Sequence, residues 1–181
     1  SIDLYNKGLK IQIKEDNSPV SNGDLRVNEL ITKKILEVTP NIPIISEETV
    51  NLNIKNKSKT FWLIDPIDGT KEFITKSGFF TINFALISNN MPVFGIISQP
   101  TTSSIWFNNN DTAYKIKNSY NITDAEELKP KIINYDKLNM ICSSTNFKLG
   151  FKSWLNIINP LKIVDIGSSL KFCYLAEGRY N

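Results

Sequence analysis

Hydrophobic and polar residues alternate along this chain with two periods, and each period predicts one kind of element. A period of two, typical of half-buried strands, recurs in short segments, whereas residues 24–39 carry apolar side chains at helical spacing until Pro40 ends the pattern. The helical period returns near the carboxyl end. We expect strands at residues 9–14, 62–65, 80–88, 93–99, 104–107, 113–116, 140–143 and 162–166, and helices at residues 24–39, 147–158 and 168–177.

The order of these elements predicts an α/β fold class. Turn residues at 89–90 and 100–101 separate the middle strands and indicate a hairpin-rich antiparallel sheet. A polar, charged region at residues 118–131 follows, and beyond it strand and helix alternate. We therefore expect an α+β first domain at residues 1–128 and the beginning of a second, α/β domain at residues 129–181, which is incomplete.

The segment W-L-I-D-P-I-D-G-T, which begins at Trp62, is the richest in candidate chemistry. Its apolar start suits a strand interior, and the proline and glycine that follow predict that the strand stops at Asp65. Asp65 and Asp68 then lie at a strand end, with the carbonyl of Ile67 facing whatever they bind. Hard oxygen ligands of this kind suit Mg²⁺. The alternative is an ordinary turn, since Asp, Pro and Gly each favour turns for separate reasons.

Neighbouring segments favour the metal-binding interpretation. P-I-I-S-E-E is another short apolar run, and it ends in the acids Glu47 and Glu48. Thr70 opens an expected helix directly after Gly69, and free N–H groups at a helix start bind anions. Two strand ends with acidic residues beside an anion site predict a metal-assisted phosphate centre.

Composition excludes several classes of protein. The 181 residues include no histidine, which rules out Ser-His-Asp and Cys-His catalysis and leaves carboxylates, lysines, hydroxyls and bound metal. A net charge of +3 without a basic run interleaved with aromatics argues against nucleic-acid binding. Cys142 and Cys173 are interpreted as small buried hydrophobes of a reduced cytoplasm. No apolar stretch reaches the roughly 18 residues of a membrane span.

Three motifs together resemble one known family. S-E-E, W-L-I-D-P-I-D-G-T-K-E-F-I and G-S-S-L-K-F-C-Y-L-A-E-G-R are similar to the inositol monophosphatase superfamily of Mg²⁺-dependent, lithium-sensitive phosphatases. The match is closest to its bacterial 3′(2′),5′-bisphosphate nucleotidase branch, in which K-E-D-N-S-P-V-S-N-G-D resembles a loop that ends in an aspartate, here Asp24. The resemblance implies a layered αβαβα sandwich with the site at the junction of two domains.

The resemblance also implies roles for the metal ligands. Asp65 would bridge two Mg²⁺ ions, of two or three in all, that lie about 3.5 to 4 Å apart. Glu47 and the Ile67 carbonyl would complete one metal site, and Asp68 would serve the other.

Further residues would act on the attacking water. By resemblance, Thr70 would contact Asp24, and with Glu47 it would orient and deprotonate that water, while the N–H groups of Gly69 and Thr70 hold the phosphate. Asp24 has the alternative of being only a helix cap. Glu48 is expected to be exposed rather than a ligand.

The implied substrate is adenosine 3′,5′-bisphosphate or its sulfated form, in sulfur metabolism. Lys71 belongs to the K-E-F-I motif of this branch, and Ser168, Ser169 and Lys171 match a second motif that would hold the non-reacting phosphate. The alternative is an ordinary helix that Ser168 or Ser169 caps. Its core-facing stripe would comprise Leu170, Cys173, Tyr174 and Leu175.

Two rival functions remain open. One is an inositol or sugar phosphate phosphatase, and the other is an inactive fragment that folds and binds metal or a partner.

Relative to the family pattern, the chain begins at Ser1 without an initiating methionine and helix and ends at Asn181 before a tryptophan-aspartate motif. We therefore expect the natural protein to continue beyond Asn181. The isolated chain is expected to self-associate, to bind the first metal weakly and to show little or no phosphatase activity. The expected location is cytoplasmic, and peripheral association with the inner membrane is also compatible with the sequence.

Overall fold

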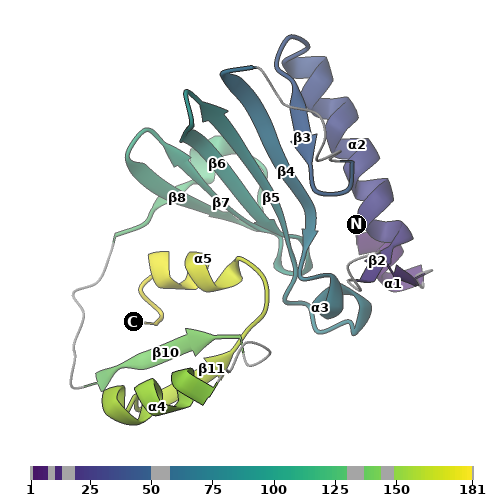
Figure 1. The fold of residues 1–181 in the computed structure, drawn as a ribbon. Helices are drawn as coiled ribbons and strands as arrows, with labels where there is room; N and C mark the ends of the chain where they lie inside the picture. Colours follow the sequence, from purple (N-terminus) through teal and green to yellow (C-terminus); the bar gives the residue numbers. More distant parts are fainter. Residues whose placement is uncertain are drawn as a thin grey trace.

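The computed structural model describes residues 2–7, 11–13, 19–49, 58–129, 137–143 and 149–180. A large sheet has helix α2 (Asn22–Val38) on one side and helix α5 (Leu170–Ala176) on the other (Figure 1). Helix α5 lies between this sheet and a small one, which α4 (Leu149–Ile158) covers from outside. The predicted α/β class and layered arrangement are confirmed.

The large sheet has seven strands in the order β3-β4-β5-β6-β7-β8-β9. Strand β3 is parallel to β4, and all the other neighbours are antiparallel, as the predicted hairpins require. Asn89 and Asn90 form one hairpin turn with positive φ angles of 49° and 64°. The strands are β3 (Ile44–Ser46), β4 (Thr60–Asp68), β5 (Thr81–Ser88), β6 (Met91–Gln99), β7 (Ser104–Asn109), β8 (Thr112–Lys117) and β9 (Glu126–Glu127).

Helix α2 begins two residues before the predicted start, because Ser21 and Asp24 form a capping box. The side chain of Ser21 accepts from Gly23 N at 3.0 Å, and Oδ2 of Asp24 accepts from Ser21 N at 2.8 Å. Asp24 is therefore the N3 residue of the helix rather than its first residue. Helix α2 ends at the C-cap Thr39, just before Pro40 as predicted.

A first hydrophobic cluster fills the space between α2 and the sheet. It joins Val27 of α2 to residues of β4 and of the short helix α3 (Thr70–Ile74). The helix α1 (Ile2–Lys7) contributes Tyr5, so the expectation that the chain begins without a helix is wrong. The buried members of the cluster are Val27, Ile67, Phe73 and Phe80.

The carboxyl-terminal part has the predicted strand-helix-strand-helix order. Strands β10 (Asn139–Cys142) and β11 (Lys162–Asp165) are parallel, and α4 lies between them in the sequence. Helix α5 then returns to the large sheet, where a second buried cluster contains Trp106, Ile166, Leu170, Cys173 and Tyr174.

Leu175 is 38% exposed and does not belong to this cluster, so its predicted place in the core-facing stripe is wrong. Cys173 is buried and Cys142 is half-buried, and both thiols are free. None of the described helices is long and apolar enough to cross a membrane.

A few expectations fall partly outside the described residues. The strand expected at residues 9–14 corresponds to β1 (Ile11–Ile13), which pairs with β2 (Pro19–Ser21), but residues 9, 10 and 14 are not described. Residues 147–148 of the helix expected at 147–158 and residues 14–18 of the loop expected before Asp24 also lie outside them.

Candidate metal and phosphate site

Strand β4 continues to Asp68, so the prediction that it stops at Asp65 is wrong. The pairing with β5 shifts register between Asp65 and Asp68, and Pro66 lies within this irregular stretch. A proline is tolerated there because a residue at a bulge need not donate a ladder hydrogen bond. Gly69 follows with a φ of 90°, which only glycine adopts readily, and it turns the chain into α3.

Asp65 has the most perturbed carboxyl group of the site. Burial, followed by the neighbouring charges of Glu47 and Asp68, raises its pKa from 3.8 to about 7, whereas a hydrogen bond from the Ile67 backbone opposes the shift. Its Oδ1 atom is buried and has no hydrogen-bond partner among the described residues. A buried, unpartnered carboxylate oxygen beside two other carboxylates is a site that a cation would stabilise.

Glu47 reaches this position from the adjacent strand. Strand β3 ends at Ser46, and Glu47 N donates to Ile64 O at 3.1 Å, which fixes the backbone beside β4. The side chain of Glu47 is hydrogen-bonded to Asp65 and lies on the exposed side of the site. Glu48 is half-buried, so the expectation that it is exposed is wrong.

Thr70 connects the strand end to helix α2. Its hydroxyl lies 3.3 Å from Asp24 Oδ1 and 3.4 Å from the carbonyl oxygen of Ile67. Asp24 is fully buried, and its other oxygen accepts from Ser21 Oγ at 2.6 Å. Asp24 therefore serves both the capping box and Thr70, and the predicted contact is present. A hydroxyl that donates to Asp24 keeps its lone pairs available for a water molecule.

Asp68 is held by donors from two other elements. Its Oδ2 atom accepts from Thr81 Oγ1 at 3.3 Å, from Asn83 Nδ2 at 3.2 Å and from the backbone N–H of Ser169. The sequence argument missed Thr81 and Asn83, which lie in β5 opposite Asp68 and Asp65 respectively. Their position depends on the register between β4 and β5. In the sequence, only the alternation of side chains within β5 indicates which of its residues share a face.

Gly69 meets the start of the last helix at the same place. A Cβ atom at Gly69 would lie 3.2 Å from Ser168 Cβ, and one at Gly167 would overlap the carboxylate of Glu72. The loop after β4 and the G-S-S motif, 98 residues apart in the sequence (69 to 167), are thus in direct contact. Lys71, the second residue of α3, is exposed.

The hydroxyls and the lysine of the second motif have different surroundings. Ser168 is buried, with a positive φ of 56°, and its Oγ accepts from Leu170 N at 3.4 Å. Ser169 occupies the N-cap position without a side-chain cap bond, because its Oγ contacts Thr81 and Asn83 instead. Lys171 Nζ donates to the carbonyl oxygens of Ser168 at 2.7 Å and Ile166 at 3.4 Å.

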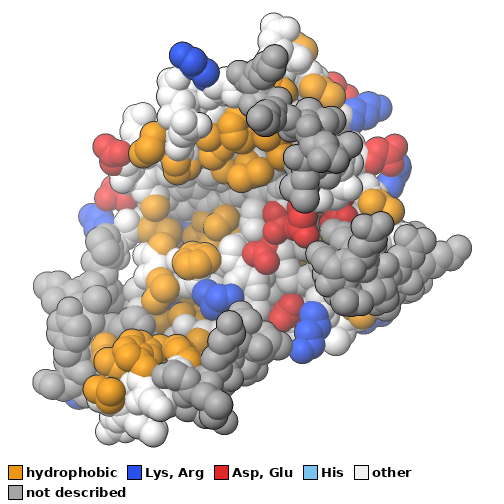
Figure 2. Space-filling model, in the orientation of Figure 1, with side chains coloured by type: hydrophobic (Ala, Val, Ile, Leu, Met, Phe, Trp, Pro, Cys, Tyr) orange, Lys and Arg blue, Asp and Glu red, His pale blue; other side chains and the backbone are white. Residues whose placement is uncertain are grey.

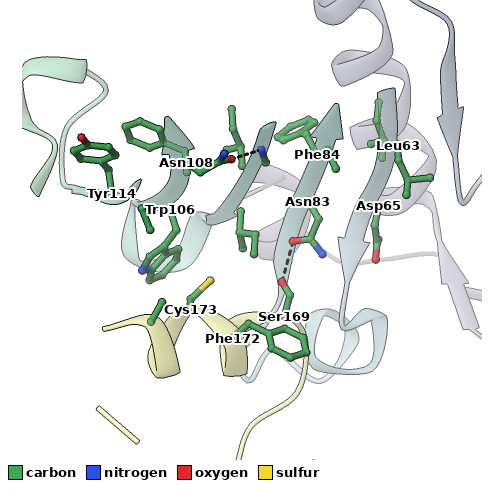
Figure 3. Close-up of a pocket in the computed structure, with 18 of the residues that line it drawn as sticks. Leu63, Asp65, Asn83, Phe84, Trp106, Asn108, Tyr114, Ser169, Phe172 and Cys173 are labelled. Atoms are coloured by element: carbon green, nitrogen blue, oxygen red, sulfur yellow. Dashed lines mark hydrogen bonds between the residues drawn. The ribbon is translucent and has the colours of Figure 1, made fainter. Parts of the chain in front are cut away.

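A cavity of about 690 Å³ adjoins the carboxylates. Apolar side chains of the large sheet and α5 line most of it, and Asp65, Asn83 and Ser169 lie toward one side (Figure 3). Figure 2 shows acidic side chains gathered at the middle of the molecule, beside hydrophobic ones. This apolar surrounding accounts for the dominant effect of burial on the pKa of Asp65.

The donor set fits a hard divalent cation. Carboxylate and carbonyl oxygens from Glu47, Asp65, Asp68 and Ile67 are grouped at two neighbouring strand ends, and the charges of Glu47 and Asp68 both raise the pKa of Asp65. Among the described residues, however, no three Asp, Glu, Cys or His side chains form a compact ligand set already arranged around a metal position. The carboxylates would need to adjust when an ion enters.

Comparisons with known proteins agree with this arrangement. A profile of the inositol monophosphatase family matches residues 2–181. The 3′(2′),5′-bisphosphate nucleotidase CysQ of Buchnera aphidicola (subsp. Acyrthosiphon pisum, strain APS) is 36% identical over 183 residues, which cover 97% of this chain and 65% of the relative. CysQ of Escherichia coli K12 is 31% identical over 178 residues, covering 96% of this chain and 68% of the relative. The chain thus spans about two thirds of the length of these relatives.

Solved structures show the same fold. CysQ of Bacteroides thetaiotaomicron superposes with a TM-score of 0.69 at 26% identity, covering 85% of this chain and 64% of that one. The suppressor protein suhB of Bartonella henselae has a TM-score of 0.79 at 20% identity, covering 98% of this chain and 69% of that one.

Proposed function

The chain belongs to the inositol monophosphatase family, and on that premise we propose that it acts as a Mg²⁺-dependent phosphomonoester hydrolase. Its proposed reaction removes the 3′-phosphate of adenosine 3′,5′-bisphosphate. The observation that carries this proposal is the group of three carboxylates, with the desolvated Asp65 at its centre, next to the Thr70–Asp24 pair. Identity of 36% to a bisphosphate nucleotidase supports the choice of substrate.

The carboxylates would hold the metal. We assign Asp65 as the shared ligand, Glu47 and the carbonyl of Ile67 to one ion, and Asp68 to a second. Bound Mg²⁺ supplies Lewis-acid polarisation of water and charge compensation for the phosphate. The unpartnered Oδ1 of Asp65 is the strongest local support for this assignment, because a buried anionic oxygen without a donor costs free energy unless a cation is present.

Thr70 and Asp24 would handle the proton of the attacking water. The buried Asp24 accepts a hydrogen bond from the Thr70 hydroxyl, so the Thr70 oxygen is oriented as an acceptor toward water. Glu47, on the open side, would take the second contact to that water and act as general base. Gly69 is the N-cap of α3 and Thr70 its first residue, and their N–H groups have no partner within the helix, which suits phosphate oxygens.

The second phosphate would bind at the contact with the carboxyl-terminal unit. Lys171 has three N–H donors, and two of them are used by the carbonyls of Ile166 and Ser168, so one is left for a phosphate oxygen. The exposed ammonium of Lys71 would add a more solvated charge. We therefore assign Lys71, Ser168, Ser169 and Lys171 to the non-reacting phosphate, and a sulfated substrate would present its group to the same residues.

Phosphate release in Mg²⁺ tests this proposal. The protein is used in molar excess, so that even a slow single turnover is detected, and adenosine 3′,5′-bisphosphate is compared with inositol 1-phosphate. We expect faster release from the nucleotide, because its second phosphate contributes binding that inositol 1-phosphate lacks. Equal rates on both substrates would contradict the proposed specificity.

A pair of variants tests the metal centre in the same assay. Asp65→Asn should lower release by at least about 100-fold, because a shared anionic ligand is lost. Asp111→Asn is the matched control, since Asp111 is an exposed carboxylate at the β7–β8 turn. Equal activity of the Asp65→Asn variant and the wild type would overturn the metal-centre assignment.

A further inference from the structure

Asn83 connects the candidate metal site to the last helix. It lies in β5 directly opposite Asp65 of β4, and its side chain points toward the cavity (Figure 3). Its Nδ2 donates to Asp68 Oδ2 at 3.2 Å, and its Oδ1 accepts from Ser169 Oγ at 2.9 Å. A single amide therefore joins a carboxylate of the large sheet to a residue 86 positions later in the sequence.

The charge of Asp68 determines the orientation of this amide. A flipped amide would place its oxygen against the carboxylate of Asp68, which repels it, and its nitrogen against Ser169. The orientation with nitrogen toward Asp68 gives both ends of the amide a complementary partner. Aspartate, leucine or alanine at this position would each lose the donor to Asp68.

The donors to Asp68 all reach the same oxygen. Thr81, Asn83 and the backbone of Ser169 contact Oδ2, so within the described residues Oδ1 is the atom that remains for a cation. Hydrogen bonds to a charged acceptor fix the rotation of the carboxylate group as well as stabilising it. Partners of this kind orient metal ligands and influence metal affinity.

The same bonds attach α5 to the sheet. Ser169 precedes the first residue of α5, and both its N–H and its hydroxyl participate. At the other end of the helix, Glu177 accepts from Trp106 Nε1 at 2.8 Å and from Lys115 Nζ at 2.7 Å. Helix α5 is thus anchored at both ends, and among the described contacts the one at Ser169 is with a candidate metal ligand.

We propose that Asn83 is a positioning residue that couples the binding of a divalent cation at Asp68 to the attachment of α5 on the sheet. The inference rests on the metal-binding role proposed above for Asp65 and Asp68. Asp68 would hold the cation through Oδ1, while the Asn83 and Ser169 donors hold its Oδ2 atom. Cation binding should therefore favour the attached position of α5, and the attached helix should in turn raise cation affinity by the same factor.

The test combines Mg²⁺ titration with amide hydrogen exchange on the full 181-residue chain. Asn83→Leu removes both polar ends of the side chain at similar volume. We expect its Mg²⁺ affinity, measured from the rise in melting temperature with Mg²⁺ concentration, to fall roughly 10- to 100-fold. We also expect Mg²⁺ to slow exchange of the α5 amides in the wild type and to leave them unchanged in Asn83→Leu.

Asn108→Leu is the matched control. Asn108 is another half-buried strand asparagine that lines the same cavity, but its bonds go to Gly95 N and to the carbonyls of Val93 and Asn110. It should keep the wild-type Mg²⁺ affinity and the slowed exchange of α5, even if it loses stability without metal. A merely structural role for Asn83 would make the two variants behave alike.

A double-mutant cycle separates the proposed coupling from a general loss of stability in one variant. Ser169→Ala removes the hydroxyl that contacts Asn83 and Thr81 and keeps the backbone N–H that donates to Asp68. If one bridge is responsible, the Mg²⁺ affinity of Asn83→Leu/Ser169→Ala should equal that of the weaker single variant, whereas additive losses would overturn the coupling. Wild-type Mg²⁺ affinity in Asn83→Leu would also overturn it and leave the proposed function standing. Equal Mg²⁺ binding by the wild type and Asp65→Asn would instead overturn the proposed function, and the inference with it.

Discussion

The metal-free protein should become more stable when Asp65 is replaced by asparagine. The pKa of Asp65 is raised from 3.8 to about 7 because the group is buried beside Glu47 and Asp68. A folded-state pKa above the unfolded value means that the stability contribution is fully present below pH 4 and is lost as the pH rises to about 7. Above pH 7 the wild type therefore carries an unfavourable buried charge that the Asp65→Asn variant lacks.

The shift in pKa sets the magnitude. A difference of about 3 units corresponds to a ceiling of roughly 4 kcal/mol, at about 1.36 kcal/mol per unit. Asp65 is only half-buried, and solvent screening reduces such values, so we expect a gain on the order of 1–2 kcal/mol at pH 8. At pH 4 the wild-type carboxyl is protonated in the folded state, and the two proteins should have similar stability.

Urea unfolding with a chelator present, followed by tryptophan fluorescence at pH 4 and pH 8, measures this difference. Adding Mg²⁺ should reverse the order at pH 8, since only the wild type gains a counter-charge for Asp65. Asp111→Asn should show neither effect. The reasoning is refuted if Asp65→Asn is no more stable than the wild type at pH 8, or if its gain is the same at both pH values.

Three further predictions concern other contacts. Thr70→Val should reduce kcat/KM by roughly 100-fold or more, while calorimetry should show an unchanged Mg²⁺-dependent rise in melting temperature. If the variant loses both its activity and this rise in melting temperature, the role of Thr70 is structural. Gly167→Ala should lower the stability toward urea because the added methyl overlaps the Glu72 carboxylate. Adding Glu72→Ala should restore that stability, and a double variant as unstable as Gly167→Ala would contradict the close contact. Glu177→Gln should lower the free energy of unfolding in urea by about 2 kcal/mol, because Lys115 is only 12% exposed and its charge loses its partner. A change smaller than the measurement error would show that this ion pair does not stabilise the fold.

The sequence predicted most of the fold because hydrophobic period and turn residues are local signals. Strands β5 to β8 and the helices α2 and α4 follow from them with small errors at their ends. The sequence predicts too short a strand β4, because Pro66 and Gly69 favour an end at Asp65. The proline is compatible with the strand because the register shift between Asp65 and Asp68 removes the need for its N–H.

The candidate site was predictable where it depends on neighbouring residues and on family motifs. Asp65, Asp68 and Gly69 are close in the sequence, and the Thr70–Asp24 contact came from resemblance. Asn83 was missed because its role depends on strand register and on a helix that returns from far along the chain. Neither leaves a local pattern in the sequence.

The Glu177 contacts were missed for a similar reason. Lys115 and Trp106 lie 62 and 71 residues before their shared partner, and no periodic pattern connects them. In the sequence, the motif A-E-G-R indicates family membership by resemblance and does not predict the contacts of its glutamate. The structure shows that its glutamate anchors α5 to strands β7 and β8.

Phosphorus NMR of adenosine 3′,5′-bisphosphate, with the protein in molar excess, tests the central claim most directly. We predict that in Mg²⁺ the 3′-phosphate resonance declines and inorganic phosphate appears, while the 5′-phosphate resonance persists as that of adenosine 5′-monophosphate. With chelator in place of Mg²⁺ the spectrum should stay unchanged. Loss of the 5′-phosphate, equal hydrolysis without Mg²⁺, or an unchanged nucleotide in Mg²⁺ would contradict the assignment of this carboxylate centre to 3′-phosphate hydrolysis.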